Sequence, residues 1–120
     1  MKHQVFVYGT LKHGGSNHHL MAGQQFIAIA KTEPLYKLYS IGAYPGMVDV
    51  PTNGNPIEGE IWAVDADCLA KLDRLEGLDE GLYKRVPIRL QPPNNVSMVE
   101  GYLYLPSIAG RRDCGTYWPV

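Results

Sequence analysis

The sequence is poor in cysteine and contains no long apolar run among its 120 residues. Its two cysteines, Cys68 and Cys114, stand far apart and form no Cys-x-x-Cys motif, so neither a disulfide framework nor a structural zinc site is indicated. No segment approaches the roughly 20 apolar residues of a membrane-spanning helix, and the first ten residues lack the apolar stretch of a secretory signal. We therefore expect free thiols and a cytoplasmic protein.

Charge of neither sign is in excess, because 11 basic residues stand against 12 acidic ones for a net charge of -1. This balance gives no electrostatic reason to expect nucleic acid or an anionic membrane as a partner, and it favours a small-molecule ligand. His18 and His19 are adjacent, so their side chains point apart and no metal site is expected. Because repeats and linker-like tracts are missing, we interpret residues 1–120 as one domain of unassigned oligomeric state.

Apolar residues alternate with polar ones in several short runs, which is typical of β-strands. The turn sequence "PPNN" between the last two runs predicts an antiparallel pair. The strands are expected at residues 5–8, 57–64, 84–91 and 97–105, with another inside 33–48, where Gly42, Pro45 and Gly46 indicate a loop. The second half of the chain is therefore predicted to be mainly sheet.

One α-helix is predicted between Asp65 and Gly77. Asp65 is a favourable N-cap residue, leucines recur at helical spacing after it, and Gly77 is a natural stop. A second, short helix is expected to begin at Asn17, whose side chain would cap it.

Glu76 lies where a helix normally avoids an acidic residue. The carbonyl groups at a helix C-terminus carry partial negative charge, and the neighbours Leu75 and Leu78 are apolar. Both conditions disfavour a charged carboxylate and predict a raised pKa for Glu76, which suits proton transfer near neutral pH. The alternative is an ordinary solvated glutamate.

The first strand runs into Tyr8-Gly9-Thr10-Leu11 without a second apolar run to form a hairpin. Gly9 allows a sharp bend, after which the N–H groups of residues 9–11 could point at one carboxylate or carbonyl oxygen. The segment contains neither a dinucleotide-binding fingerprint nor a P-loop. A tight turn without a ligand is the other interpretation.

An ordered set of motifs resembles the γ-glutamylcyclotransferase-like proteins over nearly the whole chain. The motifs are V-F-V-Y-G-T-L, K-x-G-x-x-N-H, Y-P-G, E-G-E, D-x-L-E-G and L-Y-x-R, which here occupy residues 5–11, 12–18, 44–46, 58–60, 73–77 and 82–85. The short length and Thr10 are similar to the γ-glutamylamine cyclotransferase branch. The resemblance implies an α+β fold, a small mixed β-barrel with flanking short helices.

The resemblance also implies that Glu76 is the catalytic acid/base and that the Tyr8–Leu11 loop (Tyr8, Gly9, Thr10, Leu11) binds the glutamyl part of the substrate. The expected reaction is attack of the substrate's α-amine on its own γ-carbonyl, which releases 5-oxoproline and a free amine without a cofactor. Tyr8 and Tyr83 are candidates to donate a hydroxyl to the substrate, with packing as the alternative.

Three further features leave alternatives open. Tyr104 and Trp118 belong to an aromatic C-terminal segment that could fold back over the site. Lys12 and His13 are either solvated or attract an anionic substrate. A non-catalytic protein that binds a γ-glutamyl or other small carboxylate compound, or a purely structural module, remains a competing interpretation of the whole chain.

Overall fold

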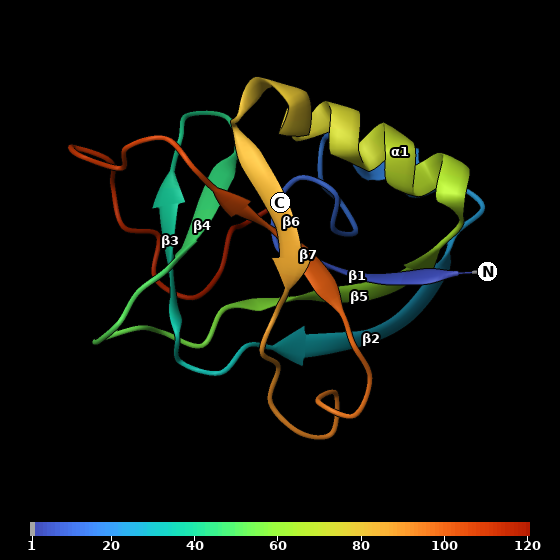
Figure 1. Ribbon diagram of the computed structural model, residues 1–120, viewed down its shortest axis with the longest axis horizontal. Helices are drawn as coiled ribbons and strands as arrows, with labels where there is room; N and C mark the ends of the chain where they lie inside the picture. Colours follow the sequence, from blue (N-terminus) through green and yellow to red (C-terminus); the bar gives the residue numbers. More distant parts are fainter. Residues whose placement is uncertain (1) are drawn as a thin grey trace.

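The computed structural model describes residues 2–120 as an α+β fold in which sheet dominates (Figure 1). A five-stranded sheet has the strand order β2-β5-β1-β7-β6, and β3 pairs with β4 in a separate two-stranded sheet. The strands are β1 (His3–Val7), β2 (Gln25–Lys31), β3 (Tyr36–Ser40), β4 (Pro45–Asp49), β5 (Glu58–Val64), β6 (Tyr83–Pro87) and β7 (Glu100–Tyr104). The helices are η1 (His18–Met21), α1 (Ala66–Leu75) and η2 (Leu78–Glu80).

The first strand lies at the centre of the large sheet. β1 pairs antiparallel with β5 and parallel with β7, with Phe6 opposite Ile61 on one side and Gly101 on the other. Val5 and Phe6 are fully buried, as expected for a strand covered on both faces. The C-terminal end of β1 therefore lies between β5 on one side and β7 on the other.

The large sheet is not a closed barrel. Its edges are β2 and β6, and within residues 2–120 these two strands are not paired with each other. One isolated bridge, between Thr32 and Leu90, joins the segments that follow them. The strands of the expected barrel are thus present as an open, curled sheet plus the β3–β4 pair.

Helix α1 has the ends that the sequence predicts. The Asp65 side chain accepts a hydrogen bond of 2.8 Å from the Cys68 amide, and Gly77 adopts the left-handed conformation with φ of 64°. Cys68, Leu69 and Leu72 form the buried face of α1. This packing holds the C-terminal end of α1, and with it Glu76, beside the sheet (Figure 1).

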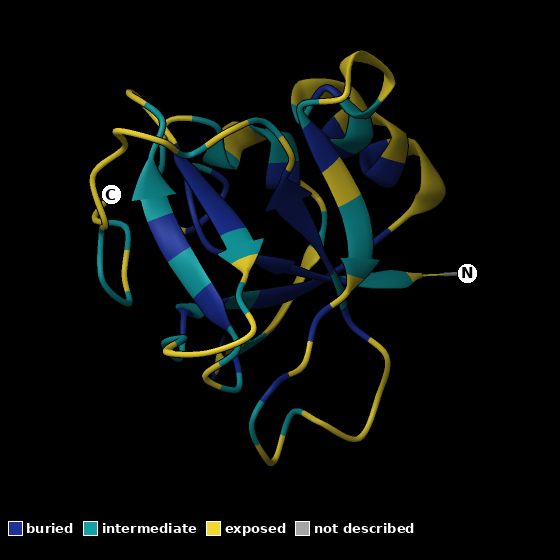
Figure 2. Cartoon of the chain, turned by 60° about the vertical axis from the view of Figure 1, so that its left-hand side comes forward, coloured by how far each residue is buried: buried dark blue, intermediate teal, exposed yellow. Residues whose placement is uncertain are grey.

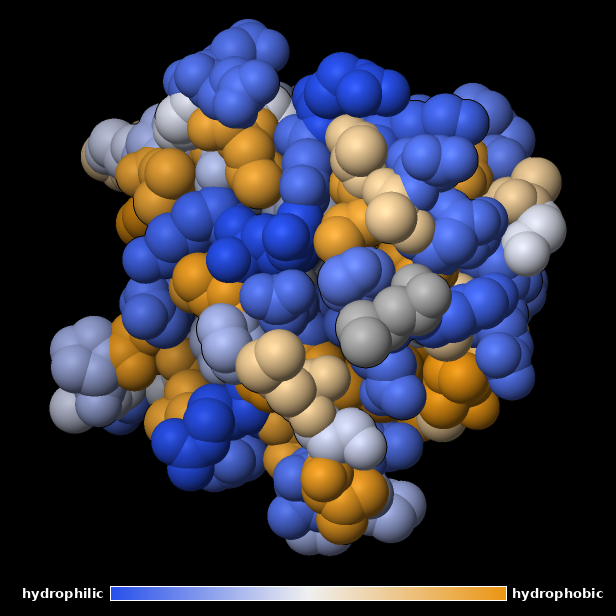
Figure 3. Space-filling model, turned by 45° about the vertical axis from the view of Figure 1, so that its right-hand side comes forward, coloured by the Kyte–Doolittle hydropathy of each residue, from blue (hydrophilic) through white to orange (hydrophobic). Residues whose placement is uncertain are grey.

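Buried residues are concentrated in the strands and on the inner face of α1, whereas exposed residues lie mainly in the connections (Figure 2). On the face drawn in Figure 3, apolar side chains form small groups among hydrophilic ones. No helix in residues 2–120 has the length and apolar character needed to cross a membrane. Both cysteines are free thiols, as predicted.

Two expectations from the sequence need correction. Strand β2 was not predicted: its residues do not alternate between apolar and polar, a β-bulge interrupts it between Phe26 and Ala28, and Phe26, Ile27 and Ile29 are all at least 40% exposed. The segment after Asn17 forms a short 3-10 helix, and the Asn17 side chain does not cap it. Asn17 instead donates to the Thr10 hydroxyl oxygen at 3.0 Å.

Candidate functional site

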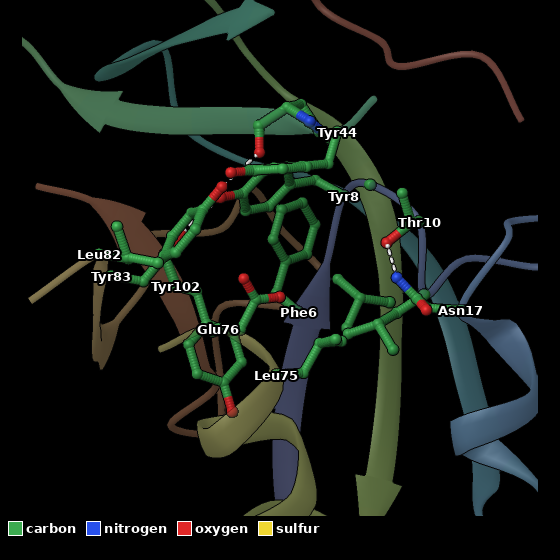
Figure 4. A pocket seen from close by; sticks show the side chains of 14 residues that line it. Phe6, Tyr8, Thr10, Asn17, Tyr44, Leu75, Glu76, Leu82, Tyr83 and Tyr102 are labelled. Atoms are coloured by element: carbon green, nitrogen blue, oxygen red, sulfur yellow. Dashed lines mark hydrogen bonds between the residues drawn. The ribbon is translucent and has the colours of Figure 1, made fainter. Parts of the chain in front are cut away.

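A cavity of about 180 Å³ opens where β1 ends (Figure 4). It is formed by the segment after β1, the start of β4, the end of α1, and residues of β6 and β7. Its lining residues are Phe6, Val7, Tyr8, Gly9, Thr10, Leu11, Asn17, Tyr44, Pro45, Leu75, Glu76, Leu82, Tyr83 and Tyr102. Glu76, Tyr83 and the Tyr8–Leu11 loop, which the sequence indicates as catalytic or substrate-binding, therefore line one cavity, whereas Lys12, His13, Tyr104 and Trp118 are not among its lining residues.

The Tyr8–Leu11 loop has a backbone shape that depends on Gly9. A Cβ atom at Gly9 would lie 2.7 Å from the Pro45 Cγ atom, so no larger residue fits without displacing β4. The loop then folds onto the following residues, since the carbonyl oxygen of Gly9 accepts from Lys12 N at 3.2 Å and that of Thr10 from Asn17 N at 3.0 Å. These bonds fix the orientation of two successive peptide groups.

The same bonds determine where the loop amides point. In a trans peptide the N–H and C=O groups point in opposite directions, so the Thr10 and Leu11 amides face away from the bonded carbonyls. Within residues 2–120, the amides of Gly9, Thr10 and Leu11 donate to no protein acceptor. This edge of the cavity is thus a row of available hydrogen-bond donors, suited to a carboxylate or a developing oxyanion.

Glu76 follows the last residue of α1, and its carboxylate points into the cavity (Figure 4). Burial raises the pKa of Glu76 from 4.5 to about 7. No hydrogen bond or cation from residues 2–120 opposes this effect. The direction agrees with the expectation from sequence, and burial is the dominant cause. Near neutral pH this carboxyl group is able both to accept and to return a proton.

Tyr8 and Tyr83 line the cavity, but their hydroxyl groups are held by the backbone. The Tyr8 hydroxyl donates to the Tyr102 carbonyl oxygen at 2.6 Å and accepts from the Met47 amide at 3.2 Å. The Tyr83 hydroxyl donates to the Pro45 carbonyl oxygen at 2.8 Å. Burial raises the pKa of both phenols, so both remain protonated. In the structure both hydroxyl groups bind the backbone of β4 and hold this strand against the cavity.

A polar network fixes α1 against the sheet from outside the cavity. Asp73, one helical turn before Glu76, forms an ion pair with Arg85 and accepts a hydrogen bond from the Tyr102 hydroxyl at 2.8 Å. Arg85 also contacts the Glu100 carboxylate at 3.3 Å. The ring of Tyr102 lines the cavity while its hydroxyl points away, toward Asp73 (Figure 4).

Several lining residues were not predicted from the sequence. Tyr44 and Pro45 lie in the Y-P-G motif, which was a usable signal, whereas Asn17 and Tyr102 enter the cavity through long-range packing that leaves no local signal. The C-terminal segment does not cover the site, because Trp118 is absent from its lining within the described residues.

Comparison with known proteins identifies the family. The profile of the family described as "Gamma-glutamyl cyclotransferase, AIG2-like" matches residues 5–118. The chain belongs to this family. A relative from Danio rerio, gamma-glutamylaminecyclotransferase A, is 39% identical over 94 residues, which cover 72% of this chain and 58% of that protein.

Other relatives carry less specific names. A putative gamma-glutamylcyclotransferase of Vibrio cholerae is 47% identical over 76 residues, 63% of this chain and 64% of that protein. For a putative Arabidopsis thaliana gamma-glutamylcyclotransferase the identity is 39% over 107 residues, 82% of this chain and 57% of that protein. The matched part thus spans less than two thirds of these relatives' lengths.

The fold of this chain is also similar to that of solved structures. The crystal structure of an AIG2-like protein from Mus musculus has a TM-score of 0.81 at 27% identity and covers 97% of this chain and 88% of that chain. The solution structure of YtfP from Escherichia coli has a TM-score of 0.69 at 31% identity and covers 96% and 94% of the two chains.

Proposed function

We propose that this protein is a γ-glutamyl cyclotransferase that converts a γ-glutamyl amine into 5-oxoproline and the free amine. The observation that carries the proposal is one cavity in which Glu76, with its pKa raised to about 7, shares the space with the three unpaired amides of residues 9–11. The first group moves protons, and the second binds an anionic oxygen. The cytoplasmic location stays a prediction from the sequence.

In the proposed mechanism, the loop amides hold the glutamyl chain in a bent shape that brings its α-amine close to the γ-carbonyl carbon. Orientation supplies much of the rate enhancement, because both reacting groups belong to one molecule. Glu76 accepts the proton that the amine loses as the C–N bond forms. It then returns the proton to the departing nitrogen as the old amide bond breaks, so the enzyme ends in its starting state.

The nature of the cavity favours an amine without a carboxylate as the leaving group. Within residues 2–120, no lysine or arginine lines the cavity, so a carboxylate on the leaving group would find no cationic partner. Tyr44 and Leu75, which are 40% and 42% exposed, offer apolar surface at the rim. This supports the γ-glutamylamine class over γ-glutamyl peptides, whose leaving group ends in a carboxylate.

The decisive experiment is a screen of γ-glutamyl compounds for release of 5-oxoproline. We expect turnover of γ-glutamyl amines with neutral alkyl groups, and a lower kcat/KM for γ-glutamyl dipeptides. Release that depends on the Glu76 carboxylate would support the proposal. Binding of 5-oxoproline without release from any compound would overturn it in favour of a non-catalytic binding protein.

A further inference from the structure

Lys12, directly after the Tyr8–Leu11 loop, is a lysine in an unusual setting. Its residue surface is only 2% exposed, so the first of the two interpretations that the sequence left open, a solvated side chain, is wrong for Lys12. Its ammonium group donates to the carbonyl oxygen of Trp118 at 2.6 Å and lies 3.6 Å from the centre of the Tyr117 ring. Lysine is almost never fully buried without a partner, and here both contacts come from the C-terminal segment.

The C-terminal segment, residues 112–118, is itself anchored to the fold. Cys114 N donates to the Leu38 carbonyl oxygen at 2.7 Å, which ties the segment to β3. The carbonyl oxygen of Thr116 accepts from Glu58 N at 2.8 Å, which ties it to the start of β5. The Trp118 side chain packs against the buried apolar cluster that contains Phe6 and Tyr8. The segment is thus held at several points before it reaches Lys12.

Lys12 in turn belongs to the turn that shapes the substrate loop. Its amide donates to the Gly9 carbonyl oxygen at 3.2 Å, and its own carbonyl oxygen accepts from Gly15 N at 2.8 Å. Gly15 packs so closely that a Cβ atom there would lie 2.1 Å from the Thr10 carbonyl oxygen. Because the turn is hydrogen-bonded and closely packed around the carbonyl groups of Gly9 and Thr10, little can move in it without changing the orientation of the peptide groups at residues 9–11.

We propose that Lys12 is a positioning residue, clamped by Tyr117 and Trp118, that holds the amides of the Tyr8–Leu11 loop in their substrate-binding orientation. This inference rests on the proposed function for the identity of the ligand. Lys12 does not line the cavity and acts through the backbone of its own turn. The C-terminal segment therefore supports the substrate site, although none of residues 112–118 lines the cavity.

Two variants remove the clamp from opposite sides. Lys12→Met keeps the length of the side chain without its charge, and truncation after Thr116 removes Tyr117 and Trp118 but keeps the Thr116 hydrogen bond to Glu58. In each we expect the Kd for 5-oxoproline to rise about fivefold or more, because binding must now order the loop, while kcat and its pH profile stay within about twofold. Lys12→Arg retains a donor for Trp118 and should restore most of the affinity.

Hydrogen exchange gives a readout that does not depend on activity. The amides of Gly15 and Asn17, both hydrogen-bonded within the turn, should exchange about tenfold faster in both variants, with helix α1 unchanged. Lys71→Met, which removes an exposed lysine on α1, is the matched control and should change neither affinity nor exchange.

The effects of the two changes on the Kd should also be non-additive. If both changes break one clamp, Lys12→Met made in the truncated chain should raise the Kd little further. Additive effects on the Kd would overturn the inference. A Lys12→Met protein with parental affinity and exchange would also overturn it, and this test does not require that the truncated chain folds. A parent protein that releases no 5-oxoproline would count against the proposed function alone, because exchange still reports on the clamp.

Discussion

Glu76 links stability and activity in opposite directions. Its folded pKa of about 7 lies above the ordinary value of 4.5, so its charged form is penalised in the folded state. The cost is absent below pH 4.5, grows as pH rises, and is fully present above pH 7. Glu76→Gln should therefore raise the free energy of unfolding at pH 8, by on the order of 3 kcal/mol at most, and have little effect at pH 4. Denaturant unfolding at the two pH values checks this.

The same substitution should remove turnover. Loss of the acid/base group is expected to lower kcat by roughly 10²- to 10⁴-fold while 5-oxoproline still binds through the loop amides. Steady-state kinetics and calorimetric titration measure the two effects separately. A Gln variant that keeps the parental rate would exclude Glu76 from the mechanism, and a clear loss of stability at pH 8 would contradict the raised pKa. Glu80→Gln, on the exposed 3-10 turn, serves as the control.

Gly9 is predicted to tolerate no side chain. The Cβ atom of an alanine would lie 2.7 Å from Pro45 Cγ, so the loop or β4 must shift. We expect Gly9→Ala to weaken 5-oxoproline binding at least about tenfold and Gly9→Val to abolish it, with circular dichroism showing a folded chain. Parental affinity in the valine variant would show that the loop amides are not the anion site.

At the scale of elements, α1 depends on Asp73 for its position against β6 and β7. Asp73→Asn keeps an acceptor for the Tyr102 hydroxyl but loses the ion pair with Arg85. We expect a loss of about 1 to 2 kcal/mol in unfolding free energy, since both side chains are only about a quarter exposed, and a lower kcat because Glu76 is less well placed. Asp67→Asn in the first turn of α1 is the control. An unchanged kcat would limit the ion pair to stability.

The elements that the sequence predicts well are those with local signals. The α1 caps at Asp65 and Gly77 and the antiparallel β6–β7 pair are confirmed, because capping and turn chemistry act within a few residues. Strand β2 had no such signal, since its apolar residues do not alternate with polar ones and a β-bulge interrupts it. The burial of Lys12 could not be predicted either, because its partner Trp118 is 106 residues away.

For the whole molecule, ligand binding should be visible as stabilisation. A ligand that binds only the folded state at a concentration 100 times its Kd adds about 2.7 kcal/mol, which corresponds to a rise in Tm on the order of 10 °C for a chain of this size. We expect this shift with 5-oxoproline in the parent and in Glu76→Gln, measured by calorimetry. No shift with 5-oxoproline or any γ-glutamyl amine would favour a structural module.

The parallel pairing of β1 with β7 has a consequence for how the chain is made. The cavity needs the loop after β1 together with Tyr83 and Tyr102, which are synthesised after the long segment that contains β2 to α1. A growing polypeptide on the ribosome therefore holds its first strand without a neighbour on that side until most of the protein has been translated. Binding competence therefore requires that β7 has been made and paired with β1, so ligand capture reports chains that extend through β7 rather than shorter products.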